Sequence, residues 1–303
     1  MRARIVSGEK MNDVAFESEK VYPLAFSSDM RVNVDDDVLV RQVAHSISLG
    51  LPQAMPYEPN PHVVALICGG PSLASTEKEL VKVAWAGAKI IAVNGAYQWC
   101  IERNLRPSGM AMIDARQFNA RFVETPVDGC EYFLASQCHP DTFDICRGRK
   151  ITLWHVLSNP EAEMKLLDDY YCEPPGEPER SRCRYFPVTM GTTVAIRALS
   201  LLRMIGFCRF EIFGLDSCWM GNEHHAYRQA ENDKEDTLSV WTRPEGRDDL
   251  ARRFICSPWQ AKQADDFIQL IKERGQLFQI NVHGDGLIAT MIKTGAQMGK
   301  EID

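Results

Sequence analysis

The stretch HVVALICGGPSL, residues 62–73, decides the fold. An unbroken apolar run followed by two glycines and a proline is typical of a buried parallel strand that turns sharply into a helix. The pattern repeats in KIIAVNGA (89–96) and PSGMAMIDA (107–115), with a helix predicted over 75–87 between the first two runs. Strands that alternate with helices in this way predict an α/β fold, a Rossmann-like parallel sheet with helices on both faces.

The rest of the chain divides around this core. An apolar helix is predicted over 190–206, a buried strand over 207–216 and a second clear helix over 258–275. We expect an N-terminal helical extension and linker (1–61), a Rossmann-like domain (62–290) and a C-terminal tail (291–303). Residues 159–184 are polar and rich in proline, and predict an exposed excursion. Residues 216–258 are also polar, and predict a lid-like segment near the C-terminus.

Composition narrows the class of protein. The 303 residues are 45% hydrophobic and 25% charged, a balance typical of globular chains that excludes disorder as a description of the whole. The net charge of -7 argues against a broad electrostatic grip on nucleic acid. No apolar run reaches the 18 residues of a membrane span, and the first 20 residues lack the apolar middle of a signal peptide. We therefore expect a cytoplasmic protein whose ten cysteines are reduced thiols.

The first candidate site is the turn after the first strand, formed by Gly69, Gly70, Pro71, Ser72 and Leu73. Glycines let the backbone approach a phosphate closely, and the helix start that follows offers unpaired N–H groups. The motif is neither the dinucleotide fingerprint nor a P-loop. The alternative is a plain tight turn between strand and helix. Since ligands of parallel sheets bind outside the carboxyl ends of the strands, this turn is a candidate site for a phosphate.

Two further strand ends carry polar residues. Asn94 follows the second strand and can hydrogen-bond a base or a ribose, although asparagine also favours turns of this kind. Asp114 follows the third strand and can hold Mg²⁺ or a sugar hydroxyl, while Arg116 can pair with a phosphate. The alternative for Asp114 and Arg116 is an ordinary surface ion pair.

The last two candidates lie in the second half of the chain. Thr189, Gly191, Thr192 and Thr193 open the apolar helix and predict a second anion-binding turn, with ordinary helix capping as the alternative. Asp216 ends the buried strand over 207–216, and a loop with adjacent histidines follows it. A histidine there can act as a general base near neutral pH. Zinc is not favoured, because no third ligand has suitable spacing. The candidate residues of this histidine loop are His224, His225 and Tyr227.

These motifs together resemble a known family. ICGGPSL, AVNGA, a strand ending in Asp-Ala-Arg, MGTTVAIRAL, IFGLD and HHAY occur in this order between residues 67 and 227. The resemblance is to the MptE-like family, formerly described as a domain of unknown function, and it runs from about 62 to 290. That family includes archaeal 6-hydroxymethyl-dihydropterin pyrophosphokinases. It is similar to the Maf proteins that modify flagellin and to bacterial sialyltransferases that use a CMP-sugar donor.

The resemblance implies roles for single residues. By likeness to the sialyltransferases, the turn Gly69 to Ser72 would approach the phosphate and ribose of the donor, and Asn94 would contact the nucleotide. The strand end at Gly214 to Asp216 also matches. The sialyltransferase base, a histidine before the last long helix, has no counterpart at 256–258. The nearest histidines are His224 and His225, where Maf-like members carry a His-Ala pair. In a pyrophosphokinase the same turn would hold ATP, with Mg²⁺ on Asp114 or Asp216.

We therefore expect a nucleotide-dependent transferase, with a glycosyltransferase that uses a nucleotide sugar as the first hypothesis. His225 would be the general base or position the acceptor, Asp216 would orient His225 or bind metal, and Tyr227 would line the site of a small-molecule or glycan acceptor. The alternatives are a pyrophosphokinase that uses ATP and Mg²⁺, a nucleotide-binding accessory protein without catalysis, and an enzyme that modifies a nucleic-acid base. Homo-oligomers are compatible with all of these. The last alternative rests on a basic cluster with nearby aromatic residues: Arg243, Arg247, Arg252, Arg253, Trp241 and Trp259.

Overall fold

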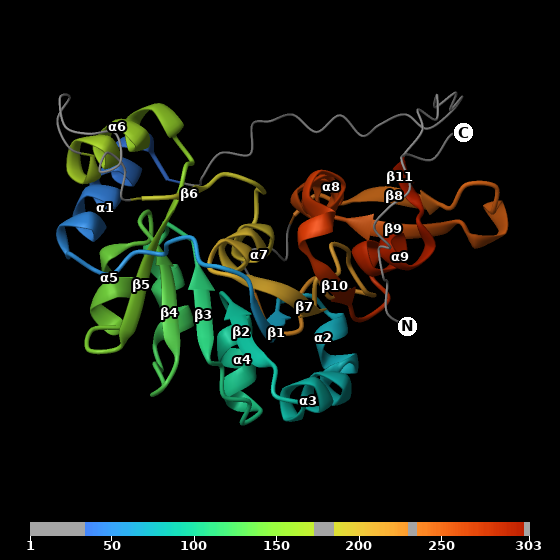
Figure 1. The fold of residues 1–303 in the computed structure, drawn as a ribbon. Coiled ribbons are helices and arrows are strands. Elements are labelled where there is room, and N and C mark those ends of the chain that lie inside the picture. Colours follow the sequence, from blue (N-terminus) through green and yellow to red (C-terminus); the bar gives the residue numbers. More distant parts are fainter. Residues whose placement is uncertain (1–33, 173–184, 230–234, 300–303) are drawn as a thin grey trace.

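Eight parallel strands form the main sheet of this protein, in a computed structural model that describes residues 34–172, 185–229 and 235–299. The strand order is β10-β7-β1-β2-β3-β4-β5-β6, and helices lie on both faces (Figure 1). The predicted Rossmann-like α/β fold is therefore confirmed. The strands of this sheet are β1 (Asn60–Ile67), β2 (Lys89–Val93), β3 (Gly109–Met112), β4 (Glu131–Ala135), β5 (Lys150–Val156), β6 (Pro187–Val188), β7 (Phe207–Phe213) and β10 (Gln279–Val282).

Helices join these strands and bury their apolar sides against the sheet. The α-helices are α1 (Asp36–Ser48), α2 (Ser72–Ser75), α3 (Glu77–Trp85), α4 (Ala96–Glu102), α5 (Pro140–Ile145), α6 (Pro160–Tyr171), α7 (Val194–Met204), α8 (Pro258–Arg274) and α9 (Leu287–Thr294). The 3₁₀ helices among the described residues are η1 (Gln117–Val123), η4 (Asp248–Leu250) and η5 (Gly275–Leu277). Among the described residues, no helix is long and apolar enough to span a membrane.

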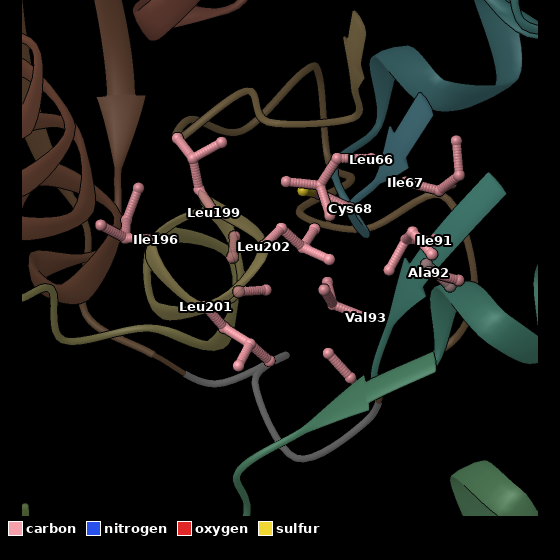
Figure 2. Packing of buried hydrophobic residues seen from close by; sticks show 14 of the residues in the cluster. Leu66, Ile67, Cys68, Ile91, Ala92, Val93, Ile196, Leu199, Leu201 and Leu202 are labelled. Carbon is pink, nitrogen blue, oxygen red and sulfur yellow. The ribbon is translucent and has the colours of Figure 1, made fainter. Parts of the chain in front are cut away.

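Helix α7 packs across the middle of the sheet, against β2, β3 and β7. Figure 2 shows Leu202 of this helix extending toward Val93 of β2, within the buried cluster that also contains Leu199 of α7 and Leu66 of β1. These four side chains are at most 3% exposed. Burial of one such side chain stabilises the fold by about 1.5–3 kcal/mol. The helix is thereby held firmly, and its first turn is placed at the carboxyl ends of the strands.

The segment 216–258, predicted to be polar and lid-like, contains two strands that the sequence did not reveal. These strands are β8 (Leu238–Arg243) and β9 (Arg252–Cys256), which pair in antiparallel fashion, and β11 (Gln297–Gly299) adds to β8. This small sheet lies beside α8 and α9 (Figure 1). In β8 and β9 buried residues alternate with arginine, serine and isoleucine at the surface, so no continuous apolar run marks these strands.

The prediction of an exposed excursion over 159–184 was wrong for its first half. Residues 160–171 form α6, which packs against α1. Leu167 is 1% exposed, and Glu163 is buried with one carboxylate oxygen accepting hydrogen bonds from the N–H groups of Ser158 and Asn159. Glutamate, lysine and aspartate surround this narrow buried stripe and hid the helical pattern. Residues 173–184 lie outside the described residues.

The order of the strands creates a switch point between β1 and β7. From β1 the chain continues to β2 on one side, whereas β7 is joined through the later elements to β10 on the other side. In parallel sheets ligands bind at such a point, outside the carboxyl ends of the two strands. Here the turns after β1 and β7 are tied directly: Cys68 N–H donates to the carbonyl of Phe213 (2.8 Å), and Gly70 N–H donates to that of Gly214 (2.7 Å).

Candidate functional site

A cavity of about 660 Å³ opens at the switch point. Its wall includes residues that follow β1, β2, β3 and β7, the first turn of α7, the histidine loop and the start of α8. Most of the residues predicted from the sequence are therefore brought together, although Pro71, Ser72, Leu73, Thr189 and Gly191 do not line the cavity. The predicted residues that do line it are Gly69, Gly70, Asn94, Asp114, Arg116, Thr192, Thr193, Asp216, His224, His225 and Tyr227.

The turn after β1 has no space for a side chain at Gly69 or Gly70, because other groups pack closely against both glycines. A Cβ on Gly69 would overlap the hydroxyl of Tyr227 and lie 2.9 Å from Cδ2 of His225. A Cβ on Gly70 would overlap the carboxylate of Asp216 and lie 2.6 Å from the carbonyl oxygen of Gly214. The carbonyl of Gly69 also accepts a hydrogen bond from Ala226 N–H (2.9 Å). Glycine at these positions lets the histidine loop pack directly onto the turn.

Asp216 lies against the start of the short helix α2. Its Oδ2 accepts a hydrogen bond from the N–H of Ser72 (2.8 Å), and the residue is 2% exposed. Burial raises the pKa of Asp216 to about 6. The other oxygen, Oδ1, is buried without a hydrogen-bond partner. The turn predicted to cradle a phosphate thus already has a carboxylate of the protein on the N–H group of Ser72.

The first turn of α7 is arranged in the same way. Oδ2 of Asp266, in α8, accepts hydrogen bonds from the N–H (2.8 Å) and the hydroxyl (2.6 Å) of Thr192. Gln263 donates to the hydroxyl of Thr193 (2.6 Å) and accepts from the hydroxyl of Ser217 (2.7 Å). Helix α8 therefore supplies the anion at the start of α7 and ties this turn to the end of β7.

Asp114 and Arg116 form a close ion pair at the cavity wall. The guanidinium donates through Nε (3.0 Å) and Nη2 (2.7 Å) to the two oxygens of the carboxylate, and the N–H of Arg116 donates to Oδ1 (3.0 Å). Burial raises the pKa of Asp114, but the bonds from Arg116 outweigh it and hold this pKa below its ordinary value. The pair is half-buried rather than at the open surface.

These contacts bear on the magnesium ion that a diphosphokinase would use. Mg²⁺ needs near-octahedral oxygen ligands and keeps several waters. Both oxygens of Asp114 are engaged by Arg116, while Asp216 is nearly sealed from solvent with one oxygen on Ser72. Within the described ranges, no three histidine, cysteine, aspartate or glutamate side chains gather as a metal site. The residues as arranged do not fit a Mg²⁺ site.

Aromatic rings form part of the cavity wall. The Nδ1 atoms of His224 and His225 lie 2.5 Å apart in a hydrogen bond. His225 also stacks on Trp259 of α8, with ring centroids 6.1 Å apart, and contacts Tyr227 at 5.5 Å. Trp219 lies beside His224. His225 is thus oriented by His224, whereas Asp216, predicted to orient it, bonds to Ser72.

Sequence reasoning missed two charged residues of the cavity wall: Glu235, whose carboxylate accepts from Nε1–H of Trp259, and Arg197. Arg197 lies in the apolar helix α7, where its Nε donates to the carbonyl of Gly191 (2.7 Å) and its Nη1 is buried without a hydrogen-bond partner. Asn94 also has a buried Oδ1 without a partner, and its φ of 45° is the left-handed value expected of a turn asparagine. No local signal distinguishes Arg197, because α7 also contains Ser200 and Arg203.

The basic cluster behind the nucleic-acid hypothesis is divided by the structure. Trp259 is part of the cavity wall, whereas the arginines belong to the β8–β9 hairpin. Arg247 pairs with Asp249, Arg252 donates to the hydroxyl of Thr290, and Arg253 donates to that of Ser239. Nucleic-acid binding by this hairpin stays a prediction.

Fold and cavity define a Rossmann-like α/β protein whose ligand crevice lies at the switch point of its sheet. The model of one protein family, described as "6-hydroxymethylpterin diphosphokinase MptE-like", matches residues 53–222. The chain belongs to this family, as its motifs predicted.

A solved structure shows the same fold. The Maf glycosyltransferase from Magnetospirillum magneticum AMB-1 superposes with a TM-score of 0.52 at 12% sequence identity. The match covers 87% of this chain and 42% of the Maf chain, so the protein spans less than half of that chain's length. No curated protein matches the sequence. At this identity, the similarity to Maf establishes the fold alone.

Proposed function

We propose that this protein is a nucleotide-dependent transferase, a glycosyltransferase that takes its sugar from a nucleotide-sugar donor. One observation carries the proposal. Among the described residues lining the cavity, three polar atoms are buried without a partner: Oδ1 of Asn94, Oδ1 of Asp216 and Nη1 of Arg197. A buried polar group left unpaired costs about 1–3 kcal/mol, which a ligand recovers by bonding to it.

A nucleotide offers a complementary group for each of these atoms. The N–H groups of a base and the hydroxyls of a ribose are donors for Asn94 and Asp216, and a phosphate is an acceptor for Arg197. The rings of His225 and Trp259 supply an aromatic wall of the kind on which a flat or amphipathic group packs. The volume of about 660 Å³ lies in the range of small-molecule sites.

The transfer itself would depend on the histidine loop. An acceptor hydroxyl attacks the anomeric carbon of the donor sugar, the bond from that carbon to the phosphate oxygen breaks, and the nucleotide leaves with the electron pair. Nε2 of His225 takes the proton of the hydroxyl, while Nδ1–H of His225 donates to Nδ1 of His224. Charge that develops on the leaving phosphate is stabilised by the fixed cation of Arg197.

A diphosphokinase is the second candidate, and the family description favours it. The same cavity would hold ATP, and a pterin would be the acceptor. This reaction commonly uses Mg²⁺, for which the engaged carboxylates of Asp114 and Asp216 do not fit. That disagreement places the nucleotide-sugar reaction first.

Turnover without an acceptor tests the proposal. The purified protein is incubated with CMP-, UDP- and GDP-sugars, and separately with ATP and Mg²⁺ with and without a hydroxymethylpterin, and nucleotide products are resolved by chromatography. We expect slow release of CMP, UDP or GDP from one donor, and its loss in His225→Ala. Formation of AMP from ATP that depends on the pterin would establish the diphosphokinase instead. No product from any substrate would contradict an enzyme and favour an accessory protein.

A further inference from the structure

We infer that Arg197 recognises the phosphate of the bound nucleotide, so that a fixed guanidinium neutralises the charge that Mg²⁺ neutralises in many nucleotide enzymes. The inference rests on the proposed function, because it needs a nucleotide in the cavity. Its starting point is that Asp114 and Asp216, the carboxylates that the diphosphokinase hypothesis assigns to Mg²⁺, are engaged here by Arg116 and Ser72.

Arg197 is held in place before any ligand binds. It lies in the first turns of α7, where Nε donates to the carbonyl of Gly191 at 2.7 Å. This bond fixes the plane of the guanidinium, so little side-chain freedom is lost when a ligand binds. Nη1 remains buried and without a partner, on a residue that lines the same cavity as Gly69 and Asn94.

The acidic side chains near Arg197 are occupied with other donors. Asp266 accepts from both the N–H and the hydroxyl of Thr192 and pairs with Lys262. Oε2 of Glu163 accepts from the N–H groups of Ser158 and Asn159, while its Oε1 is buried without a hydrogen-bond partner. Burial lowers the pKa of Arg197, and both carboxylates oppose this effect by stabilising its charge through space. The cation is therefore tolerated in a buried place while a hydrogen-bond donor is kept for a ligand.

The cavity wall carries charges of both signs. The carboxylates of Asp114, Asp216 and Glu235 line it as well, and they accept from Arg116, from the N–H of Ser72 and from Nε1–H of Trp259. Among the described lining residues, Arg116 and Arg197 are the two that carry a permanent positive charge. The charge of Arg116 is offset by its three bonds with Asp114. Arg197 thus remains as the cation toward which an oxyanion is drawn, and a guanidinium matches the oxygens of a phosphate closely.

The test measures how much affinity each phosphate adds. Dissociation constants are measured by calorimetry in EDTA for cytidine, uridine and guanosine and for their 5′-mono- and diphosphates. For the wild type we expect the diphosphate of the preferred base to bind about ten- to a hundredfold more tightly than the nucleoside. Arg197→Gln should lose most of this gain while its affinity for the nucleoside stays within about twofold. Arg197→Lys should keep part of the gain.

Arg203→Gln is the matched control, because Arg203 lies near the other end of α7 and does not line the cavity. It should keep the full gain, and thermal unfolding checks that all variants fold. Equal weakening of nucleoside and diphosphate in Arg197→Gln, or a gain that appears only when Mg²⁺ replaces EDTA, would overturn this inference alone. Failure of every nucleoside and nucleotide to bind the wild type, with and without Mg²⁺, would overturn the proposed function as well.

Discussion

Nδ1 of His224 and Nδ1 of His225 face each other at 2.5 Å. A neutral imidazole has one N–H donor and one acceptor nitrogen, so one of these two atoms carries the proton and the other accepts it. For His225 to act as a base through Nε2, its own Nδ1 must be the donor. His224 then fixes the tautomer of His225 and accepts from the imidazolium that forms, as a positioning residue.

Removal of the two imidazoles should therefore have unequal effects. We expect His225→Ala to lower the rate of transfer by about 10²–10⁴-fold, the usual contribution of a general base. His224→Ala should cost less, on the order of tenfold, because the base survives without its partner. The affinity for the nucleotide should change little in either variant. Steady-state rates together with binding constants measure this, and a near-normal rate for His225→Ala would exclude it as the base.

Asp216 should make the stability of the protein depend on pH. Its pKa in the folded chain is about 6, above the ordinary value near 4. Between these values the unfolded chain has released the proton while the folded chain keeps it, so the free energy of unfolding falls as pH rises through this window. Above about pH 6 both states are ionised and the loss is complete.

Asp216→Asn isolates this effect, since an amide oxygen can still accept from Ser72 N–H and does not titrate in this range. Urea unfolding measures the free energy of unfolding of both proteins at pH 4.5 and at pH 7.5. From the lower to the higher pH, the free energy of unfolding of the variant should rise by roughly 2 kcal/mol relative to that of the wild type. An unchanged difference between the two proteins would show that the carboxylate titrates at its ordinary value.

The two glycines of the turn should respond differently to a methyl group. In Gly69→Ala the new Cβ meets the side chains of Tyr227 and His225, which can move. The rate of nucleotide turnover should therefore fall, while the unfolding temperature changes little. In Gly70→Ala the new Cβ meets the backbone carbonyl of Gly214, which cannot move cheaply, at a cost of about 1–3 kcal/mol. Thermal unfolding and turnover of both variants decide this. Greater destabilisation by Gly69→Ala would contradict the packing described here.

Asp266 should stabilise the protein through Thr192. Asp266→Ala leaves two donors of Thr192 without an acceptor, at an expected cost of about 1–3 kcal/mol. The matched control is Asp265→Ala, whose carboxylate is more exposed and 3.5 Å from Lys262, and which should cost less than about 0.5 kcal/mol. Chemical denaturation measures both, and equal effects would argue against a structural role for the Thr192 bond.

Much of the fold and of the cavity could be predicted because both follow from local patterns. Apolar runs that end in glycine marked β1 and β2, and the rule that parallel strands share one carboxyl edge placed Gly69, Asn94 and Asp114 together. The histidine loop was predicted as part of the site because it follows the buried strand that ends at Asp216. These inferences needed no knowledge of which distant residues touch.

Other features depend on contacts between distant residues and left no local signal. Thr192 and Asp266 are 74 positions apart, so the pairing that occupies the start of α7 cannot be read from a single sequence. The partner of Asp216 is Ser72, 144 positions away. Arg197 looks like an ordinary surface position of an amphipathic helix until the fold turns it toward the cavity. Helix α6 was not predicted from the sequence, because its buried stripe is only a few residues wide.

Nucleotide binding in the cavity is the central claim, and a thermal-shift screen tests it most directly. CMP, UDP, GDP, ADP and ATP are each added at about a hundredfold excess over a micromolar dissociation constant, in EDTA and in Mg²⁺. A ligand that binds only the folded state then adds about 2.7 kcal/mol, which at this size raises the unfolding temperature by several degrees. We predict such a shift for CMP, UDP or GDP in EDTA. A shift with ATP and Mg²⁺ alone would favour the diphosphokinase, and no shift with any nucleotide would contradict the account.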